Sequence, residues 1–179
     1  MFSQKILSEE EDIFLEFKNS ITKYKNFSGI ITQIQDSQVS IGKINIAKER
    51  IRLDYIDPST ITLIIKSKRG MYYNVELNEV QYFKTKDTEA MIFYDLFYND
   101  LYLIDFIEIN KNQSLIYQKK QKVSGEDILI DIIFEKKPFL LREIILKGNN
   151  INLKIGLSDH NFNPIFQKNF FSMANPTLK

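Results

Sequence analysis

The sequence predicts an α+β fold, in which one helix leads into a single antiparallel β-rich domain spanning residues 1–179. Apolar residues recur at helical spacing only near the start of the chain, and from residue 27 they mostly alternate with a period of two. About ten or eleven strands follow one another without an internal repeat or a domain boundary. Such a meander forms a sandwich, a barrel or a curled open sheet, and the pattern alone does not choose among the three.

Composition and charge limit the partners that we expect. The net charge is +1 and 44% of the residues are hydrophobic, so neither nucleic acid nor an anionic membrane is expected as the main partner. Cysteine is absent, which excludes a disulfide framework, a thiol nucleophile and a cysteine zinc site. Three basic clusters are interpreted as solvated hairpin tips: Lys66–Lys68–Arg69, Lys119–Lys120–Lys122 and Lys136–Lys137.

The N-terminal segment is predicted to be an amphipathic helix that ends near Lys25. Ser8 and Glu11 have the spacing of a capping box, with Ser8 at the N-cap and Glu11 at N3. The apolar stripe of this helix must be covered by the sheet, and it consists of Ile13, Phe17, Ile21 and Tyr24.

Strands are predicted wherever apolar and polar residues alternate between turn residues. The expected strands are 27–35, 37–47, 50–55, 60–66, 71–76, 80–84, 114–121, 128–134, 140–147, 151–157 and 164–171. The strongest turn signals between them are 36–37, 57–59, 67–70 and 148–150.

One apolar segment interrupts the strands, and we interpret it as one or two short helices. Residues 87–97 begin with Asp87 as a capping residue, and residues 101–106 are of similar character. Because the first of these is apolar over most of its circumference, it must be buried on more than one side or cover something apolar.

The chain lacks the residues that most enzymes use, so we expect a binding protein without cofactor or metal. The single histidine, His160, lies next to Ser158 and Asp159, and adjacent residues cannot converge as a triad. His160 is therefore expected to be a solvated loop residue. No phosphate-binding or dinucleotide-binding glycine motif occurs.

The order of five short motifs resembles the LolA family of periplasmic outer-membrane lipoprotein carriers over essentially the whole chain. The motifs are Tyr24-x-x-Phe27-Ser28-Gly29-x-Ile31-x-Gln33, Gly42-x-Ile44-x-Ile46, Arg52-x-x-Tyr55-x-x-Pro58, Met71-Tyr72-Tyr73, and Phe170-Phe171-x-x-x-x-Pro176. Two positions depart from the family pattern: Lys48-Glu49 replaces its Arg-Pro, and Leu53-Asp54 replaces an aromatic residue.

The resemblance implies a single, strongly curved, unclosed antiparallel sheet (a half-barrel) with helices as a lid over its concave face. It also implies a monomeric carrier of lipoprotein acyl chains in the periplasm of a Gram-negative bacterium, with a signal peptide removed. The implied donor is an inner-membrane lipoprotein-releasing ABC transporter, and the implied acceptor lies in the outer membrane.

Site residues are predicted from this carrier model together with the apolar rows. The lipid-binding residues are expected to be Ile61, Leu63, Ile65, Met71, Tyr73, Val75, Met91, Ile92, Phe93 and Leu96. The family latches its lid with the Arg of the Arg-Pro motif; here Lys48 stands at that position, and Arg50 or Arg52 are the alternative latches.

Three other functions are weighed against the carrier. A LolB-like outer-membrane receptor, or another lipid-binding half-barrel, has the same chemistry. A protein-binding β-domain has no cavity, and an enzyme is disfavoured by the histidine and cysteine counts.

Overall fold

The computed structural model describes the backbone of residues 2–86 and 88–178, and the side chains of 11–86 and 88–178. The helices are α1 (Phe2–Thr22), α2 (Glu89–Tyr98) and the 3-10 turns η1 (Lys23–Lys25) and η2 (Asp100–Leu103). The strands are β1 (Phe27–Gln35), β2 (Gln38–Ala47), β3 (Arg50–Asp57), β4 (Ile61–Ile65), β5 (Arg69–Asn74), β6 (Glu79–Lys84), β7 (Ile107–Asn110), β8 (Ser114–Val123), β9 (Glu126–Lys136), β10 (Phe139–Lys147) and β11 (Asn152–Asn161). Within these described residues, neither α-helix is both long and apolar enough to cross a bilayer.

All eleven strands form one antiparallel sheet in the order β6-β5-β4-β3-β2-β1-β11-β10-β9-β8-β7. Two meanders, β1–β6 and β7–β11, are joined where β1 pairs with β11, with Ile31 opposite Leu157. No pairing joins β6 to β7 in the described part of the chain, so the sheet is not closed there. The prediction of a single antiparallel sheet of ten or eleven strands is confirmed.

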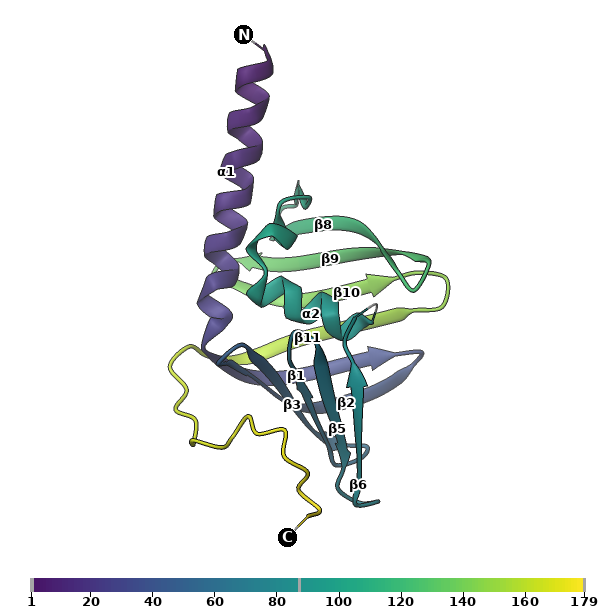
Figure 1. The fold of residues 1–179 in the computed structure, drawn as a ribbon. Helices are drawn as coiled ribbons and strands as arrows, with labels where there is room; N and C mark the ends of the chain where they lie inside the picture. The colour runs from purple at the N-terminus through teal and green to yellow at the C-terminus, as the bar shows by residue number, and fades with distance from the viewer. Residues whose placement is uncertain (1, 87, 179) are drawn as a thin grey trace.

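The helices lie on one face of the sheet, which we call the inner face (Figure 1). Helix α1 packs on it through Phe17 and Ile21, which are buried, and Ile13, which is partly buried. The Phe17 ring stacks on Tyr117 of β8, with ring centroids 4.0 Å apart. The predicted apolar stripe is therefore confirmed. The predicted start is wrong, because Ser8 lies inside a helix that already begins at Phe2.

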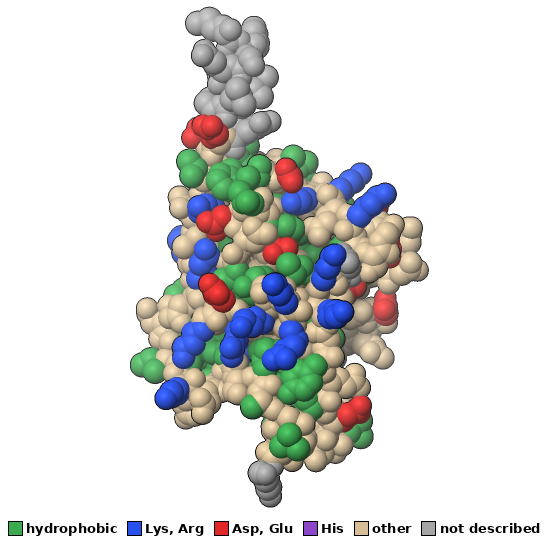
Figure 2. Space-filling view, in the orientation of Figure 1, with side chains coloured by type: hydrophobic (Ala, Val, Ile, Leu, Met, Phe, Trp, Pro, Cys, Tyr) green, Lys and Arg blue, Asp and Glu red, His purple; other side chains and the backbone are tan. Residues whose placement is uncertain are grey.

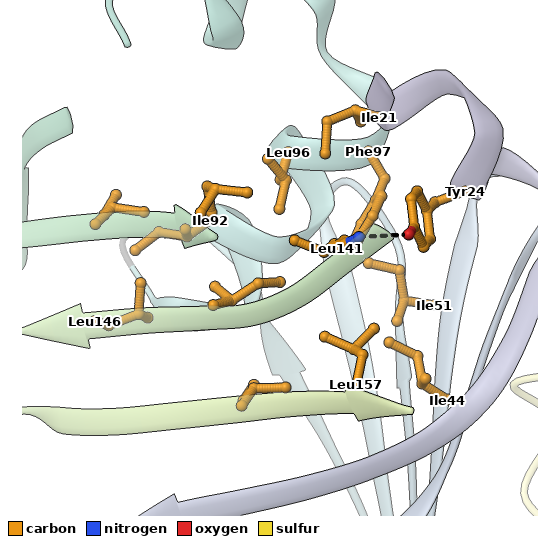
Figure 3. Packing of buried hydrophobic residues seen from close by; sticks show 14 of the residues in the cluster. Ile21, Tyr24, Ile44, Ile51, Ile92, Leu96, Phe97, Leu141, Leu146 and Leu157 are labelled. Atoms are coloured by element: carbon orange, nitrogen blue, oxygen red, sulfur yellow. Dashed lines mark hydrogen bonds between the residues drawn. The ribbon is translucent and has the colours of Figure 1, made fainter. Parts of the chain in front are cut away.

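Helix α2 lies between the two meanders in sequence and crosses the inner face in Figure 1. Three of its side chains are buried, namely Ile92, Leu96 and Phe97, and Figure 3 shows them within the packed core. Tyr94 and Tyr98 are partly buried on another side of the helix. Burial on more than one side confirms the prediction from its apolar circumference. The predicted capping residue, Asp87, lies outside the described residues. Of residues 101–106, only 101–103 are helical, as part of the turn η2.

Tyr24 joins the helical layer to the sheet. Its side chain is buried beside Phe27, and its hydroxyl accepts a hydrogen bond from the Leu141 backbone N–H at 2.7 Å (Figure 3). The register of β10 against β9 shifts between Leu141 and Glu143, so the tyrosine supplies an acceptor at an irregularity in the ladder. Burial raises the pKa of this hydroxyl to about 12.

The C-terminal residues 162–178 form no strand, so the predicted strand at 164–171 is wrong. The backbone carbonyls of Phe170 and Phe171 accept hydrogen bonds from Arg52 and Arg50 of β3 instead of from a neighbouring strand. The Arg52 guanidinium also lies 4.4 Å from the centre of the Phe170 ring. We call residues 162–178 the C-terminal segment. The sheet nevertheless has eleven strands, because it contains a short strand, β7, that was not predicted from the sequence.

Replacing Phe17 with Ala should destabilise the fold by about 3–5 kcal/mol, because it removes a fully buried ring that stacks on Tyr117. Denaturant unfolding measures the difference. The matched control is Leu15→Ala on the same helix, where half of the side chain is exposed and the change should stay within about 0.5 kcal/mol. Equal effects of the two substitutions would contradict the packing of α1.

Replacing Arg52 with Ala should loosen the C-terminal segment without loosening α2. The substitution removes a charged hydrogen bond worth roughly 1.5–3 kcal/mol, so exchange of the Ser172 amide should accelerate about tenfold or more. Hydrogen exchange followed by mass spectrometry measures both segments. Arg142→Ala, which removes an ion pair with Glu135 in the other meander, is the control. Faster exchange in α2 but not in the segment would contradict this assignment.

Candidate functional site

A partly open cavity of about 640 Å³ lies between the inner face of the sheet and the first turns of α2. Its walls come from β1 to β6 and from the start of β11, while Ala90 and Phe93 of α2 cover it. The volume lies within the range of roughly 300–1,000 Å³ that is typical of small-molecule sites.

The centre of the cavity is apolar because the strand registers align apolar residues in rows on the inner face. Leu53 of β3 lies opposite Leu63 of β4, and Leu63 lies opposite Tyr72 of β5. Phe83 of β6 reaches the same wall across Gly70, where a Cβ would come within 2.0 Å of its ring. The apolar lining residues are Leu53, Ile61, Leu63, Ile65, Phe83, Ala90, Phe93, Ile151, Leu153 and Ile155.

One end of the cavity is polar and is formed by the tips of the β1–β2 and β3–β4 hairpins. Its side chains are mostly uncharged: Gln33, Gln35, Gln38, Ser40, Tyr55 and Ser59. The Tyr55 hydroxyl donates to Gln33 Oε1 at 2.5 Å, which joins β3 to β1 across the cavity. Burial raises the pKa of Tyr55 to about 12, so it remains a neutral donor.

Among the described lining residues no Lys or Arg occurs, and the two charged ones are acidic, Asp57 and Glu89. A buried anion without a cationic partner is unfavourable. The lining can therefore surround a hydrocarbon chain and offer hydrogen bonds to a neutral polar group, but its described residues include no cationic side chain to neutralise a carboxylate or a phosphate.

Four of the ten predicted lipid-binding residues line this cavity: Ile61, Leu63, Ile65 and Phe93. Ile92 and Leu96 are buried in the core beside the cavity, whereas Met91 is only partly buried. Whether any of these residues binds lipid stays a prediction.

Met71, Tyr73 and Val75 do not belong to the predicted row, and this part of the prediction is corrected. Met71 pairs with Ile64 and Tyr73 pairs with Thr62, so both point to the outer face, opposite Leu63. Val75 lies beyond the end of β5 and is 42% exposed. The alternation along each strand predicted which residues share a face, but it could not predict how β5 pairs with β4. In the structure Tyr72 is the residue of β5 that lines the cavity.

The predicted basic latch on the lid is also corrected. The side chains of Arg50 and Arg52 bind the C-terminal segment, and Lys48 is exposed in the turn between β2 and β3. The observed link to α2 is made by the backbone, because the Tyr98 hydroxyl donates to the carbonyl oxygen of Arg50 at 3.3 Å. A tyrosine on the helix thus takes the place of a cation on the sheet.

His160 is not a solvated loop residue, because it lies on β11 and packs against the rings of Tyr24, Phe27 and Phe162. Its Nε2 is 2.8 Å from the carbonyl oxygen of Leu141, and burial lowers its pKa. Residues 11–86 and 88–178 contain no group of three or more His, Cys, Asp or Glu that could hold a metal ion.

A larger hollow, of about 1,180 Å³, lies on the outer face over β8 to β11. It is lined mainly by polar and charged residues, including Lys111, Gln113 and the ion pair of Arg142 with Glu135. The inner cavity is the better candidate site, because it combines an apolar centre with a few polar groups at one end.

Sequence reasoning missed Ile151, which directly precedes β11, and Leu153 and Ile155 of β11, all of which line the cavity. Their alternation with polar neighbours was visible in the sequence. Only the pairing of β1 with β11, which sets Leu153 opposite Gln35, brings them to the same site as β3 and β4.

No protein-family model and no curated protein sequence matches this chain. Solved structures do match. An uncharacterized conserved protein from Thermus thermophilus gives a TM-score of 0.51 at 8% identity, over 93% of this chain and 90% of that one. The Pseudomonas aeruginosa MucA/MucB complex gives 0.51 at 10% identity, over 86% of this chain and 56% of that one.

MucB in complex with MucA(peri) gives a TM-score of 0.50 at 9% identity, over 90% of this chain and 59% of that one. This chain therefore spans little more than half of the length of the MucB chains that it matches. At such low identity the likeness shows the fold alone. The chain shares its fold with MucB and with the Thermus thermophilus protein.

Proposed function

We propose that this chain is a non-enzymatic lipid-binding protein that holds an acyl chain in the cavity under α2. The observation that carries the proposal is the apolar centre of that cavity, formed by strands of both meanders and covered by Ala90 and Phe93. Each CH₂ group removed from water contributes about 0.8 kcal/mol, so even part of an acyl chain would be held firmly. Such binding needs no catalytic group.

The finer form of the proposal is a carrier of lipoprotein acyl chains in the periplasm, with the sheet strongly curved around the cavity as a half-barrel. Three features support it: helices pack against one face, the cavity lies on that face, and β6 and β7 leave the sheet unclosed in its described part. A membrane transporter as donor and an outer-membrane protein as acceptor complete the carrier proposal.

Helix α2 is suited to control access to the cavity. Ile92, Leu96 and Phe97 anchor it in the core, while Ala90 and Phe93 cover the ligand space. An acyl chain that enters must displace the contacts of Phe93. We therefore propose that the first turns of α2 compete with the ligand for the same apolar surface, which keeps binding reversible.

A second candidate is a protein-binding domain. It is favoured by the MucB structures, which were solved as complexes with MucA, and by the exposed aliphatic side chains of the outer face, Ile34, Val39 and Ile41. A protein partner on that face would not depend on the cavity, so the ligand-binding experiment separates the two functions.

Replacing Leu63 with Glu should abolish binding of a fluorescent fatty-acyl ester, because it places a carboxylate in the apolar centre. The control is Ile41→Glu, which adds the same charge at an exposed position on the outer face of the sheet. Titration of probe fluorescence measures both. Ile61→Trp fills the cavity without adding a charge and should also lose binding. It therefore tests the site even if Leu63→Glu does not fold. Absence of binding by the parent chain would falsify the proposal.

Acyl compounds with a neutral head group should bind better than the corresponding fatty-acid anion, by roughly threefold to tenfold. The reason is that the described lining offers amides and hydroxyls but no cation. Displacement of the probe by a monoacylglycerol and by the fatty acid of the same length measures the ratio. Asp57→Lys adds a cation at the polar end and should reduce or reverse the preference. An unchanged ratio in that variant would show that the head group lies elsewhere.

A further inference from the structure

Charge is segregated along the β2–β6 part of the sheet, although the whole chain is nearly neutral. One end of these strands, which we call the basic end, carries seven cations: Lys48, Arg50, Lys66, Lys68, Arg69, Lys84 and Lys86. Among the described residues, its acidic residues are Glu49 and Glu89. The charged residues that the structure describes at the opposite end, around the turns 36–37, 58–60 and 75–78, are all acidic: Asp36, Asp57, Glu76 and Glu79.

Antiparallel pairing brings the basic end together from segments that are separate in sequence. Arg69 lies directly opposite Lys84. The buried Thr85 hydroxyl donates to the Ser67 carbonyl at 2.8 Å, which fixes Lys86 near the turn that carries Lys66 and Lys68. Figure 2 shows Lys and Arg side chains gathered across the middle of one face, where α2 and adjoining strand ends lie in Figure 1.

Six of these cations are available to a partner, because they are exposed. Arg50 is half-buried, and its side chain binds the Phe171 carbonyl. Within the described residues none of the seven forms an ion pair within 4.0 Å. Like charges directly opposite each other on antiparallel strands are destabilising, as Arg69 and Lys84 are here. The unbalanced charge points to an anionic partner that neutralises it.

We propose that the basic end docks on an anionic lipid surface. A flat polyanionic surface can meet several turns at once, and each Lys or Arg near such a surface adds to the attraction. Tyr82, whose ring lies 5.4 Å from the Arg69 guanidinium, is 46% exposed beside it. Tyrosine favours membrane–water interfaces, since its ring is apolar and its hydroxyl is polar. The choice of lipid over other polyanions rests on the proposed lipid function.

Docking would also place the support of α2 at the surface. The Tyr98 hydroxyl of α2 donates a hydrogen bond to the carbonyl oxygen of Arg50, which begins β3 at the basic end. The helix that covers the cavity is thus tied to the basic end. A lipid surface that binds this end therefore lies next to the cover of the cavity.

The test is sedimentation of the full chain with vesicles of phosphatidylcholine, with and without phosphatidylglycerol, at about 0.1 M salt, where charges interact over roughly 10 Å. The parent chain should bind only the anionic vesicles and should be released by high salt. The triple substitution Lys66→Gln, Lys68→Gln and Lys86→Gln should weaken binding by about a hundredfold, at roughly fivefold for each charge.

The matched control is Lys120→Gln, Lys122→Gln and Lys147→Gln, which removes the same number of exposed lysines from the other meander. It should retain binding within about threefold, since interactions beyond the roughly 10 Å screening length are weak. Equal losses in the two variants would overturn the proposal, because net charge alone would then explain binding. Absence of vesicle binding by the parent, or tighter binding to duplex DNA at the same salt, would overturn it too.

Binding of the fluorescent acyl ester should be the same in both triple variants, because none of the six lysines lines the cavity. If the parent chain binds anionic vesicles but not the ester, the proposed acyl-chain binding is contradicted and the docking surface is supported. If it binds the ester but not the vesicles, the docking surface is contradicted and acyl-chain binding is supported.

Discussion

The pairing of β1 with β11 is the constraint on which the rest of the structure depends. Every other strand pairs with a neighbour in sequence, whereas this pairing joins residues 27–35 to residues 152–161. It fuses two local meanders into one sheet, and only then do α1 and α2 have a continuous surface to cover. The cavity depends on it as well, because its walls come from β3 and β4 on one side and from β11 on the other.

The inner face changes character along the strands, and this change creates the site. Near α1 it is covered by large, buried rings that pack against one another, such as Phe17, Tyr117 and Phe134. Toward the tip of the β1–β2 hairpin, glutamines and serine point inward, while Ile34 and Val39 point outward and remain exposed. Because the apolar side chains of this hairpin point outward, few of them fill the core at that end. The apolar side chains of β3 and β4 on the inner face are therefore left uncovered and line a cavity.

The outer face over β3 is covered by the C-terminal segment, and arginine side chains hold this segment in place. Arg50 and Arg52 hold backbone carbonyls of the C-terminal segment, and a cluster of the rings of Phe166, Phe170 and Phe171 accompanies them. The guanidinium group suits this task, since it donates several hydrogen bonds and also lies over an aromatic ring. The helix over the cavity is tied to β3 instead by the neutral hydroxyl of Tyr98. Its release therefore does not require a buried charge to be separated from its partner.

The sequence by itself determined the local elements: the apolar stripe of α1, ten of the eleven strands, the buried character of α2, and the absence of cysteine chemistry. These follow from periodicity, which the chain carries residue by residue. Tertiary structure alone decided the register of β5, which turned Met71 and Tyr73 outward and Tyr72 inward. It also decided the partners of Arg50 and Arg52, the role of β11 in the cavity, and the gathering of seven cations at one end of a nearly neutral chain. Each of these depends on which distant segments become neighbours, and alternation along one strand contains no information about its partner.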